Sequence, residues 1–144
     1  MHRDVYFGYV RLHGEEHINA LQAASNYADS LLSLRRFKEA KRVLRKVLPV
    51  ARRVLGEGDD LTLRMRWNYA RALCYDPSAT LDDLREAVTT LEHTERIARR
   101  VLGGAHPLVL DMERKLRNSR AALRARETGR RVLFLNEHRH PEVV

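Results

Sequence analysis

Two stretches of the sequence carry side chains of the kinds that bind metal ions. Residues 13–17 hold two histidines and two glutamates, and His138 and His140 stand close together near the end of the chain. Imidazole and carboxylate groups are ligands that zinc accepts. The order within 13–17 is not the zinc-protease His-Glu-x-x-His, however, and the second pair has no third ligand nearby. We therefore expect no metal and no other cofactor.

Candidates for covalent or acid–base catalysis are equally sparse. Cys74 is the single cysteine, and no accompanying set of residues would make it a nucleophile, so a plain core thiol is expected. The paired acids Asp59-Asp60 and Asp82-Asp83 stand at the starts of predicted helices, where the positive end of the helix dipole accounts for them. A glycine-rich phosphate loop is missing from the sequence. These observations predict a protein without catalytic activity.

Arginine gives the chain its charge. Lys and Arg number 27 against 19 Asp and Glu, the net charge is +8, and the pI is about 10.2. A basic balance favours acidic peptides, nucleic acid or anionic membranes as partners. The densest run, 114–120, continues to Arg124, Arg126, Arg130 and Arg131, so a helix here could follow a phosphate backbone. No aromatic residue interleaves this run, which leaves base stacking unsupported and favours a solvated helix face.

An internal repeat organises the whole chain. The sequence Ala-Arg-Arg-Val-Leu-Gly at 51–56 returns unchanged at 98–103. Gly14 stands 42 residues before Gly56, and Gly103 stands 47 residues after it. A period of this length is typical of stacked helical repeats. We expect units at 12–54 and 55–101, a half unit at 102–127, and a C-terminal tail at 128–144.

The periodicity of apolar residues places the helices of each unit. Thr80, with Asp83 three residues later, predicts a capping box, while Pro49 predicts a kink inside a helix rather than its end. Gly129 is expected to end the last helix. The predicted helices are a segment ending at 13, then 18–34, 37–55, 61–74, 81–102 and 107–127. Their inward stripes include Leu21, Ala24, Ala28, Leu31; Phe37, Ala40, Val43, Leu44, Val47, Ala51, Val54; Leu63, Trp67, Ala70, Leu73; Leu84, Ala87, Leu91, Thr94, Ala98, Val101; and Val109, Met112, Leu116, Leu123.

The repeated motifs resemble those of the tetratricopeptide repeat, in its longer kinesin-light-chain type. The linkers 13–21, 55–63 and 102–110 are similar to the family's Leu-Gly-x-x-His-Pro-x-x-Leu. The first helices carry Asn26-Tyr27-Ala28 and Asn68-Tyr69-Ala70 for its Asn-Leu-Ala, and the second helices carry Phe37-Lys38-Glu39-Ala40 and Leu84-Arg85-Glu86-Ala87 for its Tyr-x-Glu-Ala. The third unit has Lys115-Leu116-Arg117 instead, which leaves open that its helix is a cap. The resemblance implies an all-α fold, with antiparallel helix pairs stacked as a short right-handed superhelical solenoid.

The resemblance also implies a concave groove, lined by the first helix of each pair, that holds a peptide. Asn26 and Asn68 would pair with the peptide backbone, the basic residues would bind carboxylates, and Trp67 or Tyr75 would be an apolar anchor. The alternative for Trp67 is that its side chain lies in the hydrophobic core and not in the groove. Transferred by position, the groove residues are Gln22, Ser25, Asn26, Asp29 and Ser33; Arg64, Trp67, Asn68, Arg71 and Tyr75; and Arg114, Lys115 and Asn118.

The sequence therefore predicts a non-catalytic scaffold whose partner is a protein or peptide, expected to be acidic. Nucleic acid bound through the basic last helix is the less favoured alternative, and self-association through the exposed last helix is a third. No apolar run is long enough to span a membrane, so no membrane partner is expected. A single cysteine fits a reducing, cytoplasmic location.

Overall fold

The chain folds into helices joined by short connections. The computed structural model describes residues 2–137 of the 144, and this range contains six helices and no β-strand. The prediction of an all-α fold is thereby confirmed. No helix within this range combines the length and the apolar character needed to cross a bilayer. The helices are α1 (His2–His13), α2 (Ile18–Ser33), α3 (Phe37–Leu55), α4 (Asp60–Tyr75), α5 (Leu81–Leu102) and α6 (Pro107–Glu137).

The predicted helix limits agree with the structure except at the end of the last helix. The α6 helix continues through Gly129 to Glu137, so the prediction that it ends near residue 127 was wrong. One glycine costs a helix only about 1 kcal/mol relative to alanine, and Arg126, Glu127, Arg130 and Arg131 around it are good helix formers. Of the predicted tail, residues 138–144 lie outside the described range, together with the pair His138 and His140. Pro49 lies inside α3, which passes through it without ending.

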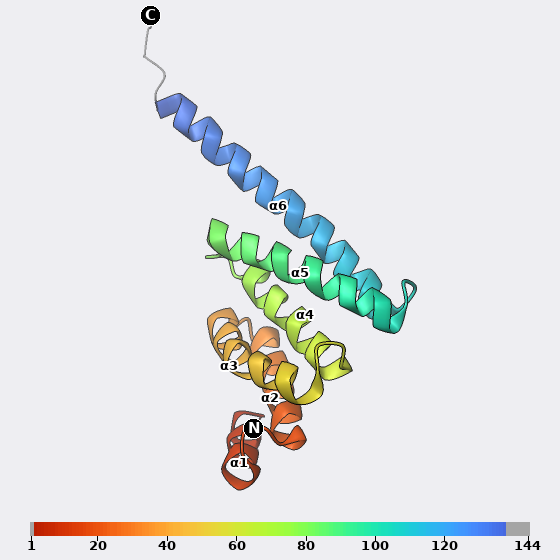
Figure 1. Ribbon diagram of the computed structural model, residues 1–144. Coiled ribbons are helices and arrows are strands. Elements are labelled where there is room, and N and C mark those ends of the chain that lie inside the picture. The colour runs from red at the N-terminus through yellow and green to blue at the C-terminus, as the bar shows by residue number, and fades with distance from the viewer. Residues whose placement is uncertain (1, 138–144) are drawn as a thin grey trace, which may run out of the picture.

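Consecutive helices pack side by side in a row that begins with α1 and finishes with α6 (Figure 1). The α2 helix also contacts α4 directly, so two helices separated by α3 in sequence share an interface. Most of the predicted inward residues are buried at these contacts, among them Leu21, Leu44, Leu63 and Leu91. Burial of such side chains supplies about 1.5–3 kcal/mol each and is the main force that holds the row together.

Two of the predicted inward residues are exposed. Val54 and Val101 occupy equivalent positions in the last turns of α3 and α5, and they are 42% and 50% exposed. Each lies next to a linker rather than beneath another helix, and a Cβ placed on Gly58 of the second linker would approach Val101 to 3.2 Å. The apolar residues of α3 and α5 thus recur as far as the last turn, but the neighbouring helix does not extend far enough to cover them there.

The three linkers share their local geometry. Gly14, Gly56 and Gly103 have φ of 85°, 92° and 92°, in the left-handed region that glycine adopts without a steric penalty. Three residues after each glycine, a side chain caps the next helix by accepting a backbone N–H. The caps are His17 Nδ1 to Asn19 (3.1 Å), Asp59 Oδ1 to Leu61 (2.9 Å) and His106 Nδ1 to Leu108 (3.1 Å).

The α5 helix begins differently, with the predicted capping box. The Asp83 N–H donates to Thr80 Oγ1 at 3.1 Å, and the Thr80 N–H donates to the Asp83 carboxylate at 3.0 Å. This prediction is confirmed. The backbone hydrogen bond from Thr80, together with Lys41 nearby, holds the pKa of Asp83 below its ordinary value, although burial opposes the shift.

A polar network joins α3, α4 and the second turn of α5. Arg45 Nε donates to the Tyr69 hydroxyl at 2.8 Å, the Tyr69 hydroxyl donates to Glu86, and Arg45 and Glu86 form an ion pair at 3.2 Å. Burial, followed by the hydrogen bond to Glu86, raises the pKa of Tyr69 to about 12. The network therefore holds a protonated tyrosine at the contact of three helices.

Candidate functional site

A cleft lies between α4 and α6 and has a volume of about 550 Å³. This is within the size range of pockets that bind small ligands or short peptide segments. Three of its side chains recur at four-residue steps along one face of α4, and the others come from successive turns of α6. The lining residues are Trp67, Arg71 and Tyr75 from α4, and Asp111, Arg114, Lys115 and Asn118 from α6.

Six of these seven residues are among the predicted groove residues, and the fold brings them together from two helices. Asp111 is the one that the sequence analysis missed. It stands three and four residues before Arg114 and Lys115, on the same face of α6, so helical periodicity could have identified it. Its carboxylate lies 3.8 Å from Arg114. The cleft thus contains three cationic side chains and one anionic side chain.

Arg71 is the most firmly positioned cation of the cleft. Its Cζ lies 5.9 Å from the ring centre of Trp67 and 5.7 Å from that of Tyr75, so the guanidinium is within cation–π distance of both rings. Lys115 Nζ lies 3.5 Å from the centre of the Tyr75 ring on α6's side of the cleft. Since the aromatic rings fix these cations in place, an anion bound between them would require little further ordering of side chains.

Asn68 does not line the cleft, contrary to the predicted contact with a peptide backbone. Its side chain is 4% exposed, Nδ2 donates to Asp29 at 2.8 Å, and Oδ1 accepts from Arg71 Nη1 at 3.1 Å. The amide therefore connects α2 with α4 and orients Arg71. The feature that sequence reasoning explained by ligand binding, an amide in a helix interior, is explained here by a contact between helices.

The remaining predicted residues lie apart from the cleft. Ser25 is buried, whereas Gln22 and Asn26 are exposed on α2 and hydrogen-bond to each other at 3.2 Å. Arg64 is exposed and forms an ion pair with Asp60 one turn earlier, at 2.9 Å. Ser33 is exposed at the end of α2. Trp67 contacts both the cleft and the core, because its ring packs against the apolar clusters shared by α4, α5 and α6.

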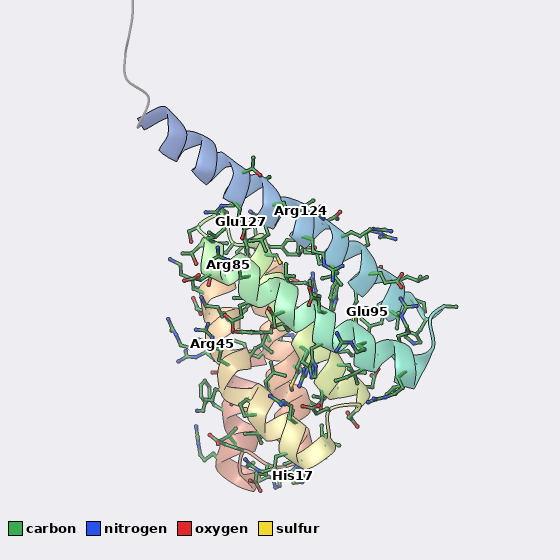
Figure 2. All side chains as sticks on the ribbon, turned by 45° about the horizontal axis from the view of Figure 1, so that its top comes forward. His17, Arg45, Arg85, Glu95, Arg124 and Glu127 are labelled. Atoms are coloured by element: carbon green, nitrogen blue, oxygen red, sulfur yellow. The ribbon has the colours of Figure 1, made fainter. Side chains whose placement is uncertain are left out.

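The basic residues of α6 serve two different purposes. Three ion pairs join α5 to α6 at seven-residue steps along both helices: Arg85 with Glu127, Glu92 with Arg120, and Arg99 with Glu113. Figure 2 shows Arg85 and Glu127 next to each other at one end of this series. Arg120 is thus engaged with α5, and Arg126 donates to the carbonyl of Ala79. Arg117 and Arg124 are exposed on the outer side of α6, which neither α4 nor α5 covers, and Arg114 is exposed at the cleft.

The side chains considered for metal binding and catalysis have structural contacts. In residues 13–17, His17 caps α2, its ring stacks on His13 at 4.7 Å, and the two glutamates pair with Lys46 and Arg53 of α3. No three histidine, cysteine or acidic side chains converge on a metal-sized site within the described part of the chain. Burial raises the pKa of the Cys74 thiol, partly offset by a hydrogen bond to Ser119, so that the less nucleophilic protonated form is favoured.

No protein-family model and no curated protein matches this chain.

Proposed function

We propose that the protein is a non-catalytic scaffold of the tetratricopeptide kind, which binds an acidic peptide in the cleft between α4 and α6. The observation that carries this proposal is the composition of the cleft. Arg71, Arg114 and Lys115 converge there with two aromatic rings and one opposing carboxylate. Cations can bind the carboxylates of a peptide, and the rings offer apolar surface to a neighbouring side chain.

The repeated linker geometry supports the repeat architecture within this proposal. Three linkers place a left-handed glycine and a helix cap at the same spacing, and each sends the chain into a helix that packs on its predecessor. In a right-handed solenoid of helix pairs, α2, α4 and α6 would line the concave side. The cleft lies between two of these three helices. A cytoplasmic location belongs to the same proposal, because the lone thiol requires no oxidising compartment.

The test compares two double variants that change the net charge equally. Arg71→Glu with Lys115→Glu reverses two cations of the cleft, whereas Arg117→Glu with Arg124→Glu reverses two cations on the outer side of α6. Binding would be measured by fluorescence anisotropy with short labelled peptides that carry several Asp and Glu residues and one tryptophan. We expect the cleft variant to weaken binding at least about tenfold, and the outer variant to change it little.

Circular dichroism would establish that both variants keep their helices. Equal loss of binding in the two variants would mean that general charge attraction, and not the cleft, holds the peptide. A weaker effect in the cleft variant than in the outer variant would contradict the proposal outright.

A second candidate function is binding of a nucleic-acid backbone, and the exposure of Arg114, Arg117 and Arg124 on α6 favours it. Two other arginines of α6 weigh against it. Arg120 pairs with Glu92 and Arg126 donates to the carbonyl of Ala79, so both are less available to phosphate groups. The same outer variant tests it with a DNA duplex as probe. Affinity should fall steeply with salt in the wild type, and the slope should become shallower by about two units after both arginines are reversed.

Self-association through α6 is a third proposal, and the composition of its outer side weighs against it. That side presents arginines at the positions where a packed helix of this row carries apolar or small residues, so two copies would meet there with like charges.

A further inference from the structure

The α1 helix has an outer face that no other helix covers in the described part of the chain. Its inner face packs against α2 through the buried Tyr6, and α2 is its one extensive helix contact within residues 2–137. Val5 and Leu12, on one flank of the uncovered face, are 44% and 76% exposed, whereas Phe7 packs beside Tyr6 and lines a cavity with Tyr27 of α2 and Val43 of α3. Val47 stands 42 residues after Val5, at the equivalent position of α3. By contrast with Val5 it is buried, because α3 packs against both α2 and α4. Figure 1 shows α1 at the end of the row, away from α6.

Gly8 lies in the middle of this outer face, and the single chain gives no reason for a glycine there. It is inside a continuous helix, its φ is not in the left-handed region, and a Cβ built on it would meet nothing within 4 Å. Glycine destabilises a helix interior relative to alanine. Close approach of another backbone is a setting in which a helix benefits from the missing side chain.

The charges of the face are complementary to themselves. Asp4 and Arg11 are exposed and stand on either side of Gly8, about 10 Å apart along the helix. A second α1 that crosses antiparallel near Gly8 would place its Arg11 beside Asp4 and its Asp4 beside Arg11. A twofold axis requires this reciprocity, since residue i contacts residue j on both sides of it.

We propose that two copies of this chain associate through antiparallel α1 helices that cross at Gly8. Val5 and Leu12 supply the apolar contact, and two Asp4–Arg11 pairs fix the antiparallel orientation. A helix of 12 residues buries less surface than the roughly 800 Å² per partner of a typical stable complex. The dimer is therefore weak and depends on concentration.

The test is sedimentation velocity of the full chain over a roughly hundredfold range of concentration at low salt. The wild type should shift from 16.8 kDa toward twice that mass as concentration rises. Asp4→Arg should weaken association about tenfold, because it places two arginines opposite each other, and Arg11→Asp should do the same. The double variant Asp4→Arg with Arg11→Asp restores the pairing and should restore association.

Gly8→Leu gives an independent readout, because it favours the helix but blocks the close crossing. It should remain monomeric at all concentrations while its thermal midpoint stays the same or rises. Arg100→Asp, at an exposed position of α5, serves as the matched charge control and should associate as the wild type does. A wild type that stays at 16.8 kDa throughout overturns the proposal, and so does a dimer that neither the charge reversals nor Gly8→Leu weakens.

Discussion

The α4 and α6 helices begin alike but differ in the surroundings of their outer faces. Both follow a left-handed glycine and a side-chain cap, and counting from Gly56 and Gly103 makes Ala70 equivalent to Arg117 and Leu63 to Leu110. Ala70 and Leu63 are fully buried, whereas Arg117 is exposed and Leu110 is 44% exposed. The α4 helix is covered by α5, which follows it in sequence. After α6 no further helix packs in the described part of the chain.

This difference shows the effect of an arginine at a position where the equivalent helix has alanine. At position 70 alanine allows α4 to pack against Val88, Leu91 and Leu116. At position 117 the guanidinium gives α6 a polar outer side. Within the described residues α6 is the last helix of the row, its inner side packs against α5, and another side lines the cleft.

The largest expected effect comes from transferring the arginine of α6 into α4. Ala70→Arg would bury an unpaired charge in a space that fits a methyl group, and we expect the free energy of unfolding to fall by about 3–5 kcal/mol. The reverse change, Arg117→Ala, should alter it by less than about 0.5 kcal/mol. Urea unfolding followed by circular dichroism measures both. Similar losses for the two variants would mean that the two faces are not different environments.

An intermediate effect concerns Tyr69, whose equivalent in α6 is Leu116. Because its pKa is about 12 in the folded protein and near 10 when unfolded, the native state keeps the proton that the unfolded state loses between these values. Stability contributed by Tyr69 is thus present below pH 10 and is lost as pH rises toward 12. The wild type should lose roughly 2–3 kcal/mol more than Tyr69→Phe over this interval. Parallel stability curves for the two proteins in alkaline urea titrations would contradict the assignment.

The smallest expected effect is at the caps. Asp59 caps α4 with a carboxylate, and His106 caps α6 with an imidazole nitrogen. A carboxylate is the better cap and also interacts favourably with the helix dipole. His106→Asp should therefore stabilise the protein by about 0.5 kcal/mol, and Asp59→His should destabilise it by a similar amount. The thermal unfolding midpoints of the two variants test this prediction. A lower midpoint for His106→Asp would show that the two caps are not interchangeable.

Local features of the fold could be predicted from the sequence because neighbouring residues determine them. The Thr80–Asp83 capping box and the starts of α5 and α6 agree with the sequence analysis. The continuation of α6 through Gly129 was missed, because one unfavourable residue is outweighed by many favourable neighbours. The exposed Val54 and Val101 were missed because an apolar period does not reveal where the covering helix ends.

The candidate site could be predicted only in part, for the same reason. Helical spacing identifies the face that carries Trp67, Arg71 and Tyr75, and it could have added Asp111. It could not reveal that Asn68 is buried against Asp29 of another helix. Nor could it separate the arginines that pair with α5 from those that remain exposed, since the two groups alternate within one run.

By itself the sequence determined the helices, their caps, their order and their repeat, because each depends on contacts between residues a few positions apart. Only the tertiary structure decided which helix faces are covered and which remain open. Packing brings α4 and α6 to the two sides of one cleft, and within residues 2–137 it leaves the outer faces of α1 and α6 without a neighbouring helix. Burial and ion pairing depend on distances between segments far apart in sequence, and these distances are set when the helices pack.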